Sequence, residues 1–273
     1  MKKRLPNIVL VAIFVIGLSL ILYPALSDYW NSFHQTVAIA TYTEAVEQID
    51  DNTYQEMREA AKQYNDRIPN DVSRWVLNDE EKAEYKQLLD VSGTGIMGYI
   101  QIPSLGCEFP IYHGVDESVL RIAIGHIEGS SLPIGGVGTH TVLSGHRGLP
   151  SAKLFSDLDE MAEGDVFFLQ VMDETLTYEV DKISIVLPND LEQLEIEDDE
   201  SYCTLVTCTP YGINSHRLLV RGRQVETVDG GASIRVMADA IQIKPVIVAP
   251  IVAIPMLFLL LVFLLMQPKK NKK

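Results

Sequence analysis

Apolar residues form two long runs near the ends of the chain and shorter runs between them. The first long run covers Ile8 to Leu22 and continues without a charge to Asp28, and the second covers Val246 to Met266. Each run has about the length that a helix needs to cross the hydrocarbon core of a bilayer. We therefore predict two transmembrane helices.

Each long run also has a simpler interpretation. A basic start followed by an apolar centre is typical of a cleaved signal peptide, and the C-terminal run could form a buried core helix. The first run is long for a signal peptide and no small-residue cleavage site follows it clearly, while the second ends in a basic cluster. We favour two uncleaved spans.

Between the runs, the spacing of apolar residues changes from helical to β-like. Residues 40–66 place apolar side chains at helical spacing up to Pro69. Asn78 followed by Glu81 resembles a capping signal, which opens a short helix to about Leu89. An N-terminal helical region is therefore expected before the strands begin.

From Ile96 onward, short apolar and β-branched runs alternate with turns rich in Gly and Pro. The expected strands are 96–102, 108–112, 139–143, 166–172, 175–187, 202–207 and 216–224, with short helices at 118–124 and 152–161. Closely spaced short strands indicate an antiparallel or mixed β-barrel with peripheral helices. The fold class is therefore mostly β, flanked by transmembrane helices.

The pattern divides the chain into six parts. They are a basic N-terminus with a transmembrane helix (1–28), a helical region (29–94), the β-barrel domain (95–226), a linker (227–245), a second transmembrane helix (246–266) and a basic tail (267–273).

Charge placement predicts how the chain crosses the membrane. The net charge is −15, yet the outer flanks Met1–Arg4 and Lys269–Lys273 contain seven basic residues and no acidic ones. Because basic flanks stay in the cytoplasm, both termini are expected inside and the acidic middle outside the cell. An acidic surface of this kind disfavours nucleic acid as a partner.

The chain has three cysteines, so at least one thiol stays outside any intramolecular disulfide. Cys208 ends a strand just before Pro210 and Gly212, and alternation puts it on the face opposite Cys203. A thiol at a strand end can serve as a nucleophile in acyl transfer, although a buried structural cysteine is the common alternative. Cys203 is expected to be buried, and Cys107 to be a bystander. No spacing of Cys and His residues indicates a metal site.

Two histidines qualify as a proton carrier for such a thiol. His146 lies between Gly145 and Gly148, where small residues permit close approach. His126 has a similar local sequence, and propensity does not separate the two.

An arginine begins the strand after Cys208. Arg217 can neighbour the thiol across a short hairpin, where a guanidinium stabilises a developing oxyanion by forked hydrogen bonds. Arg221 shares its face and is the rival for this role.

These residues resemble the sortases, cysteine transpeptidases of the Gram-positive surface. Thr204-Leu205-Val206-Thr207-Cys208 matches the Thr-Leu-x-Thr-Cys pattern, Arg217 the downstream arginine, and His146 the upstream histidine. The resemblance covers about residues 95–223. The Thr-Cys-Thr-Pro-Tyr-Gly and His-Arg-Leu-Leu-Val-Arg-Gly segments and the second span look most like the class C, pilin-polymerising branch.

The resemblance implies an eight-stranded β-barrel and a division of labour among the three residues. Cys208 would attack the Thr carbonyl of a Leu-Pro-x-Thr-Gly-like sorting signal, His146 would move the proton, and Arg217 would hold substrate and oxyanion. A lysine amine of a pilin subunit would resolve the thioester, and no cofactor is needed. A cell-wall precursor amine as acceptor is the housekeeping alternative.

One departure concerns the lid that class C enzymes carry as an Asp-Pro-aromatic segment. Here Asp71 is followed by Val72, and no such tripeptide occurs. Trp75 could still cover the cleft, or it could pack against a neighbouring helix.

Two other functions remain. An L,D-transpeptidase would carry a Ser-x-Gly-Cys-type segment, which is absent. A membrane-tethered binding module that lost activity would be expected to lose part of the Cys, His and Arg set, which is intact.

Overall fold

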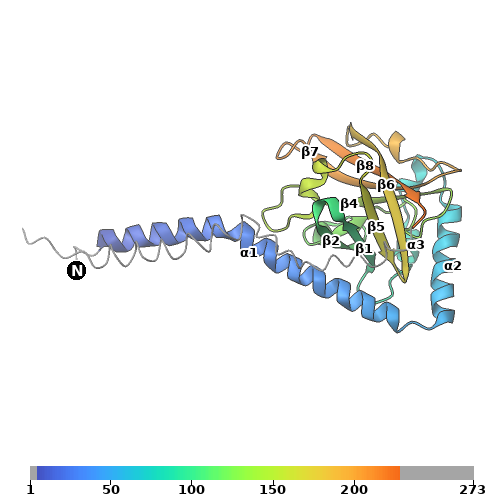
Figure 1. Cartoon of the computed structure of the whole chain (residues 1–273), viewed down its shortest axis with the longest axis horizontal. Helices are drawn as coiled ribbons and strands as arrows, with labels where there is room; N and C mark the ends of the chain where they lie inside the picture. Colours follow the sequence, from blue (N-terminus) through green and yellow to red (C-terminus); the bar gives the residue numbers. More distant parts are fainter. Residues whose placement is uncertain (1–4, 228–273) are drawn as a thin grey trace, which may run out of the picture.

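Eight strands close into a barrel in the computed structural model, which describes residues 5–227 (Figure 1). The strands are β1 (Ile96–Ile102), β2 (Cys107–His113), β3 (Ile124–His126), β4 (Thr139–Ser144), β5 (Val166–Val171), β6 (Glu174–Val186), β7 (Ser201–Thr209) and β8 (His216–Val225). They are joined in the order β1-β2-β3-β4-β7-β8-β6-β5. The predicted mixed barrel is therefore confirmed.

Two neighbouring pairs in the barrel are parallel, β2 with β3 and β4 with β7, and the others are antiparallel. Strand β7 lies between β4 and β8, and nearly every residue from Ser201 to Thr209 is buried although four of them carry hydroxyl groups of Ser or Thr.

The sequence pattern missed one strand. Residues 118–124 were expected to form a helix followed by a loop, but α4 covers only Glu117–Leu120 and β3 begins at Ile124. Three residues are too few to show a period of two, so β3 could be recognised only from its partners in the barrel. The expected helix at 152–161 is a 3-10 segment, η3 (Leu154–Glu160).

Four helical segments precede the barrel, and the short η2 (Pro103–Leu105) and η4 (Glu192–Leu194) lie between its strands as α4 and η3 do. The four that precede it are α1 (Leu5–Glu47), α2 (Asp51–Arg67), η1 (Val72–Trp75) and α3 (Asp79–Tyr85). The prediction of a single helix over 40–66 is wrong, because α1 ends at Glu47 and α2 begins at Asp51. The Asp50 side chain accepts hydrogen bonds from the N–H groups of Asn52 and Thr53 and so caps the new helix. The Asn78–Glu81 capping box that opens α3 is present as expected.

Helix α1 continues unbroken through the predicted N-terminal span, with Pro24 inside it. From Val9 onward it is long and apolar enough to cross a membrane. Its second half passes alongside the barrel (Figure 1). The basic start Met1–Arg4, most of the linker 227–245, the second span 246–266 and the basic tail lie outside the described residues.

Candidate active site

Cys208 lies near the end of β7, half-buried, on the outer face of the barrel. Alternation along the strand works as expected. Cys203 and Leu205 belong to the main core, whereas Val206 belongs to a second, outer apolar cluster. Cys208 shares the face of Val206, so its side chain lies on the outer side of the barrel, next to the second apolar cluster, and not in the main core.

Arg217 is the cross-strand partner of Cys208. The antiparallel register of β7 and β8 pairs the two residues directly, and the same arginine pairs with Val186 of β6 on its other side. Directly opposed residues have Cβ atoms about 4.5–5.5 Å apart. The guanidinium donates to the carbonyl oxygens of Asn214 (3.3 Å) and His216 (3.1 Å). The register therefore places Cys208 and Arg217 directly opposite each other on neighbouring strands.

The parallel pairing of β4 with β7 places His146 and Cys208 at the same end of the barrel. Ser144 pairs with Val206, so His146 and Cys208 each lie two positions beyond that pair. Two hydrogen bonds extend the contact past the end of β4: the Gly145 N–H donates to the Val206 carbonyl (3.1 Å), and the Thr207 hydroxyl donates to the Gly145 carbonyl (2.8 Å). The histidine loop is thereby tied to the strand of the cysteine.

Gly145 cannot carry a side chain at this crossing. A Cβ there would stand 2.6 Å from Ile124 and 2.7 Å from Phe155. Gly148 has a φ of +76°, and a Cβ on it would stand 2.6 Å from the Tyr211 ring. The glycines on either side of His146-Arg147 therefore leave room for neighbouring side chains that a Cβ would displace.

The sequence pattern did not identify two charged side chains of this region, Glu117 beside His146 and Arg147 in the same loop. The Glu117 carboxylate lies 3.8 Å from the His146 Nε2 atom, and the hydrogen bond and positive charge of Arg121, followed by His146, lower the pKa of that carboxyl. Arg147 bridges Asp159 (2.5 Å) and the Thr209 hydroxyl (3.4 Å). These contacts could not be predicted from local patterns, because the partners are distant along the chain. Asp159 and Thr209 are 12 and 62 residues from Arg147, and Glu117 is 29 residues from His146.

His126 and Arg221, the alternatives to His146 and Arg217, are held by contacts within the barrel. His126 is fully buried, with its ring nitrogens bonded to the Tyr85 hydroxyl (2.9 Å) and the Ser131 carbonyl (2.9 Å), and burial lowers its pKa to about 4. Arg221 forms a forked pair with Asp181 at 2.6 and 3.1 Å and lies 4.0 Å over the Tyr202 ring.

The other cysteines differ from Cys208 in setting. Cys203 is fully buried, and burial raises the pKa of its thiol, as expected for a structural cysteine. Cys107 begins β2 and is half-buried. Within residues 5–227 no cluster of His, Cys, Asp and Glu side chains has the composition of a metal site.

A strap formed by residues 70–76 covers the outer apolar cluster. The Asn70 amide bonds the backbone of Ile196 in both directions (2.8 and 3.1 Å), and Arg74 donates to the Leu194 carbonyl. Trp75 packs on the cluster, which contains Val142, Val186, Leu194, Val206 and Leu219. Trp75 thus packs on the barrel face that also carries Cys208, two residues beyond Val206.

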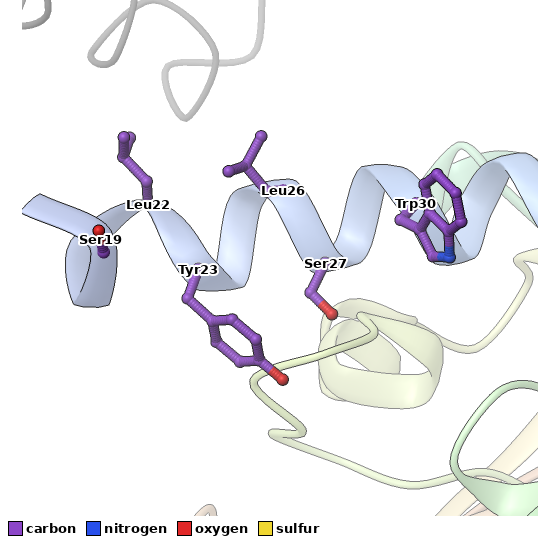
Figure 2. Close-up of a pocket in the computed structure, with 6 residues that line it drawn as sticks. All are labelled: Ser19, Leu22, Tyr23, Leu26, Ser27 and Trp30. Carbon is purple, nitrogen blue, oxygen red and sulfur yellow. The ribbon is translucent and has the colours of Figure 1, made fainter.

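A separate hollow lies along α1. Figure 2 shows Ser27 and Tyr23 pointing toward the segment after β4, with Leu22 and Leu26 pointing away. It belongs to the helix and not to the strand ends that carry the candidate residues.

Comparison with known proteins shows what the chain is similar to. Residues 100–225 match the family model described as Sortase domain. The structure resembles sortase C1 from Streptococcus agalactiae, with 49% identity over 70% of this chain and 99% of that chain and a TM-score of 0.67. It also resembles Streptococcus pneumoniae sortase C, with 44% identity over 70% and 97% of the two chains and a TM-score of 0.63. Sortase A of Bacillus anthracis is 26% identical over 83% of this chain and 97% of its own length.

Proposed function

Because the chain belongs to the sortase family of cysteine transpeptidases, we propose that Cys208, His146 and Arg217 are its catalytic residues. The observation that carries this proposal is the convergence at one end of the barrel. Cys208 pairs with Arg217 across β7 and β8, and the parallel pairing of β4 with β7 places His146 at the same end of the barrel.

The reaction that these groups can perform is acyl transfer through a thioester. The Cys208 thiol passes its proton to His146, its sulfur bonds to the Thr carbonyl carbon of a sorting signal, and the bond from that carbon to the Gly nitrogen breaks. His146 gives that proton to the departing amine. An acceptor amine then attacks the thioester carbonyl, His146 takes a proton from it, and the sulfur leaves and regains its proton from His146.

Arg217 is proposed to hold the substrate and the oxyanion. It shares the outer face with Cys208, and its guanidinium has five donors in a fixed fork. In the structure it donates to carbonyl oxygens of its own loop. A substrate carbonyl can replace these acceptors, since such contacts exchange one backbone oxygen for another.

The proposed substrate is a Leu-Pro-x-Thr-Gly-like signal of a pilin or surface protein, and the proposed acceptor is a pilin lysine amine. The similarity to two streptococcal sortase C structures, one of them reported with regard to pilin substrate specificity, supports this choice. A cell-wall precursor amine is the alternative acceptor. Competition between a lysine-containing pilin fragment and an oligoglycine amine distinguishes the two by product mass.

We further propose that the strap, residues 70–76, acts as a lid without the Asp-Pro-aromatic sequence. Its support is the Trp75 ring on the apolar cluster that includes Val206, two residues before Cys208. Because Asn70 and Arg74 fasten the strap to the loop 191–197 by bonds to its backbone, opening it would break a small number of polar contacts.

The proposed setting is the cell membrane, with the barrel outside. The N-terminal half of α1 has the length and composition of a membrane span. The basic residues before it favour a cytoplasmic N-terminus, and the second span would return the C-terminus to the cytoplasm.

Paired substitutions test the catalytic assignment. With a fluorescent sorting-signal peptide and a lysine acceptor, Arg217→Lys is expected to lower kcat/KM by about 100-fold, because one oxyanion donor is worth that much. Arg221→Lys, on the same strand and face, is expected to leave it within about threefold. His146→Gln should abolish turnover, whereas His216→Gln should not. Equal losses within either pair would contradict the assignment.

A further inference from the structure

Helix α1 connects the predicted span to the barrel without a break and is bonded to the barrel along one stripe. Asp28 accepts from the Lys153 N–H (2.8 Å) and Asn31 donates to the Ser151 carbonyl (2.6 Å). Farther along, Gln35 donates to the Ile122 carbonyl (2.6 Å) and the Tyr42 hydroxyl to the Met97 carbonyl (2.9 Å). These contacts fix the orientation of the barrel relative to the span.

The outer boundary of the bilayer can be located on α1. From Leu5 to Tyr23 a helix rises about 27 Å, close to the hydrocarbon thickness of about 30 Å. Beyond this point Tyr29, Trp30 and Phe33 are 57–71% exposed. Exposed aromatic rings of this kind are typical of the membrane–water interface. The headgroup layer therefore begins near Tyr23 and contains the next two to three turns.

The segment after His146 lies at the level of this layer. Asp28 and Asn31, which bind Lys153 and Ser151, are only five and eight residues beyond Tyr23, or about 8–12 Å along the helix axis.

The loop between β7 and β8 lies next to the same segment, because the Tyr211 ring contacts Gly148. Figure 1 shows this loop (orange) and the segment after β4 (yellow-green) on the side of the barrel from which the N-terminal half of α1 arrives.

The tip of this loop has the chemistry of an interfacial contact. Tyr211 and Ile213 are 65% and 72% exposed, and residues 209–215 carry no charge although the chain carries a net −15. A neutral tip with one aromatic and one branched aliphatic side chain fits the boundary between headgroups and acyl chains. It offers nothing specific to an anionic headgroup.

We infer that the β7–β8 loop docks on the outer surface of the bilayer through Tyr211 and Ile213. The contact continues the interfacial belt of α1, and it places the strand end of Cys208 at the membrane surface. The site would then face peptides that are held at the membrane. The inference rests on the proposed N-terminal span.

Depth-dependent quenching tests this contact on the full chain in bilayers. Ile213→Trp adds a probe to the tip, and Val137→Trp is the matched control, since Val137 is 73% exposed before the opposite end of β4. With lipids brominated close to the headgroup, the emission added by Ile213→Trp is expected to be quenched at least twofold more than that added by Val137→Trp. The difference should survive 1 M salt.

Equal quenching of the two added tryptophans, while Trp30 is quenched in a Trp75→Phe background, would overturn the inference and leave the span intact. If Trp30 is not quenched either, the span itself fails. A difference that salt abolishes would overturn the apolar mode of contact. Tyr211→Trp, a conservative aromatic exchange, provides a second probe if Ile213→Trp does not fold.

Discussion

The Thr207 hydroxyl offers a sharp test of how the site is assembled. It donates to the Gly145 carbonyl (2.8 Å) and is almost fully buried. One end of this bond adjoins Cys208 and the other adjoins His146. Thr207→Val keeps the shape of the side chain and removes the bond, while the bond from the Gly145 N–H to Val206 remains. The strands should stay paired with a looser histidine loop.

Two magnitudes follow from this contact. A buried carbonyl that loses its partner costs about 1–3 kcal/mol of folding free energy. A displacement of about 1 Å between reacting groups can cost about 100-fold in rate. We therefore expect Thr207→Val to lower kcat/KM by about 10- to 100-fold while the protein stays folded at 25 °C.

Thr141→Val is the control for stability. Thr141 lies on β4, is equally buried, and donates to the Ser131 carbonyl (2.9 Å), away from Cys208. Because the Ser131 carbonyl keeps its bond to the His126 ring (2.9 Å), Thr141→Val should lose no more thermal stability than Thr207→Val, measured by unfolding in detergent. Only Thr207→Val should lose transpeptidation of a sorting-signal peptide. If the two variants lose activity equally per folded molecule, the bond has no positioning role and the reasoning is refuted.

Two other properties follow from the structure. His126 and His140 are buried, and burial lowers the pKa of each to about 4. The unfolded chain therefore binds more protons than the folded chain as the pH falls below 6.5, and these two groups should lower the free energy of unfolding by about 4 kcal/mol from pH 7.5 to pH 5. Equal melting temperatures at the two pH values would contradict this. Trp75→Ala should raise the alkylation rate of Cys208, followed by peptide mass, by several-fold if the strap covers the thiol, and an unchanged rate would remove the lid proposal.

Strands with a clear period could be predicted from the sequence. The alternation along β7 correctly separated Cys203 from the face of Cys208, because side chains in a strand alternate whatever their neighbours are. The capping box at Asn78 was likewise a local signal. Local sequence patterns therefore predicted most of the strands and the face of β7 on which Cys208 lies.

Nonlocal contacts could not be predicted in this way. Sequence did not separate His146 from His126, because the difference lies in the Tyr85 and Ser131 groups that enclose His126 from other segments. It also missed β3, whose three residues exist as a strand only between β2 and β4. The continuous α1 was hidden because its second half is polar on one side and binds the barrel through single side chains.

The central claim is that Cys208 forms the thioester. The full chain is mixed with a sorting-signal peptide without an acceptor amine, quenched in acid and digested, and the masses of the peptides that contain each cysteine are measured. We predict the acyl mass on the Cys208 peptide of the parent and its absence in Cys208→Ala, whereas Cys203→Ala keeps it. An acyl mass on another cysteine, or none under conditions in which a known sortase forms its adduct, would contradict the account.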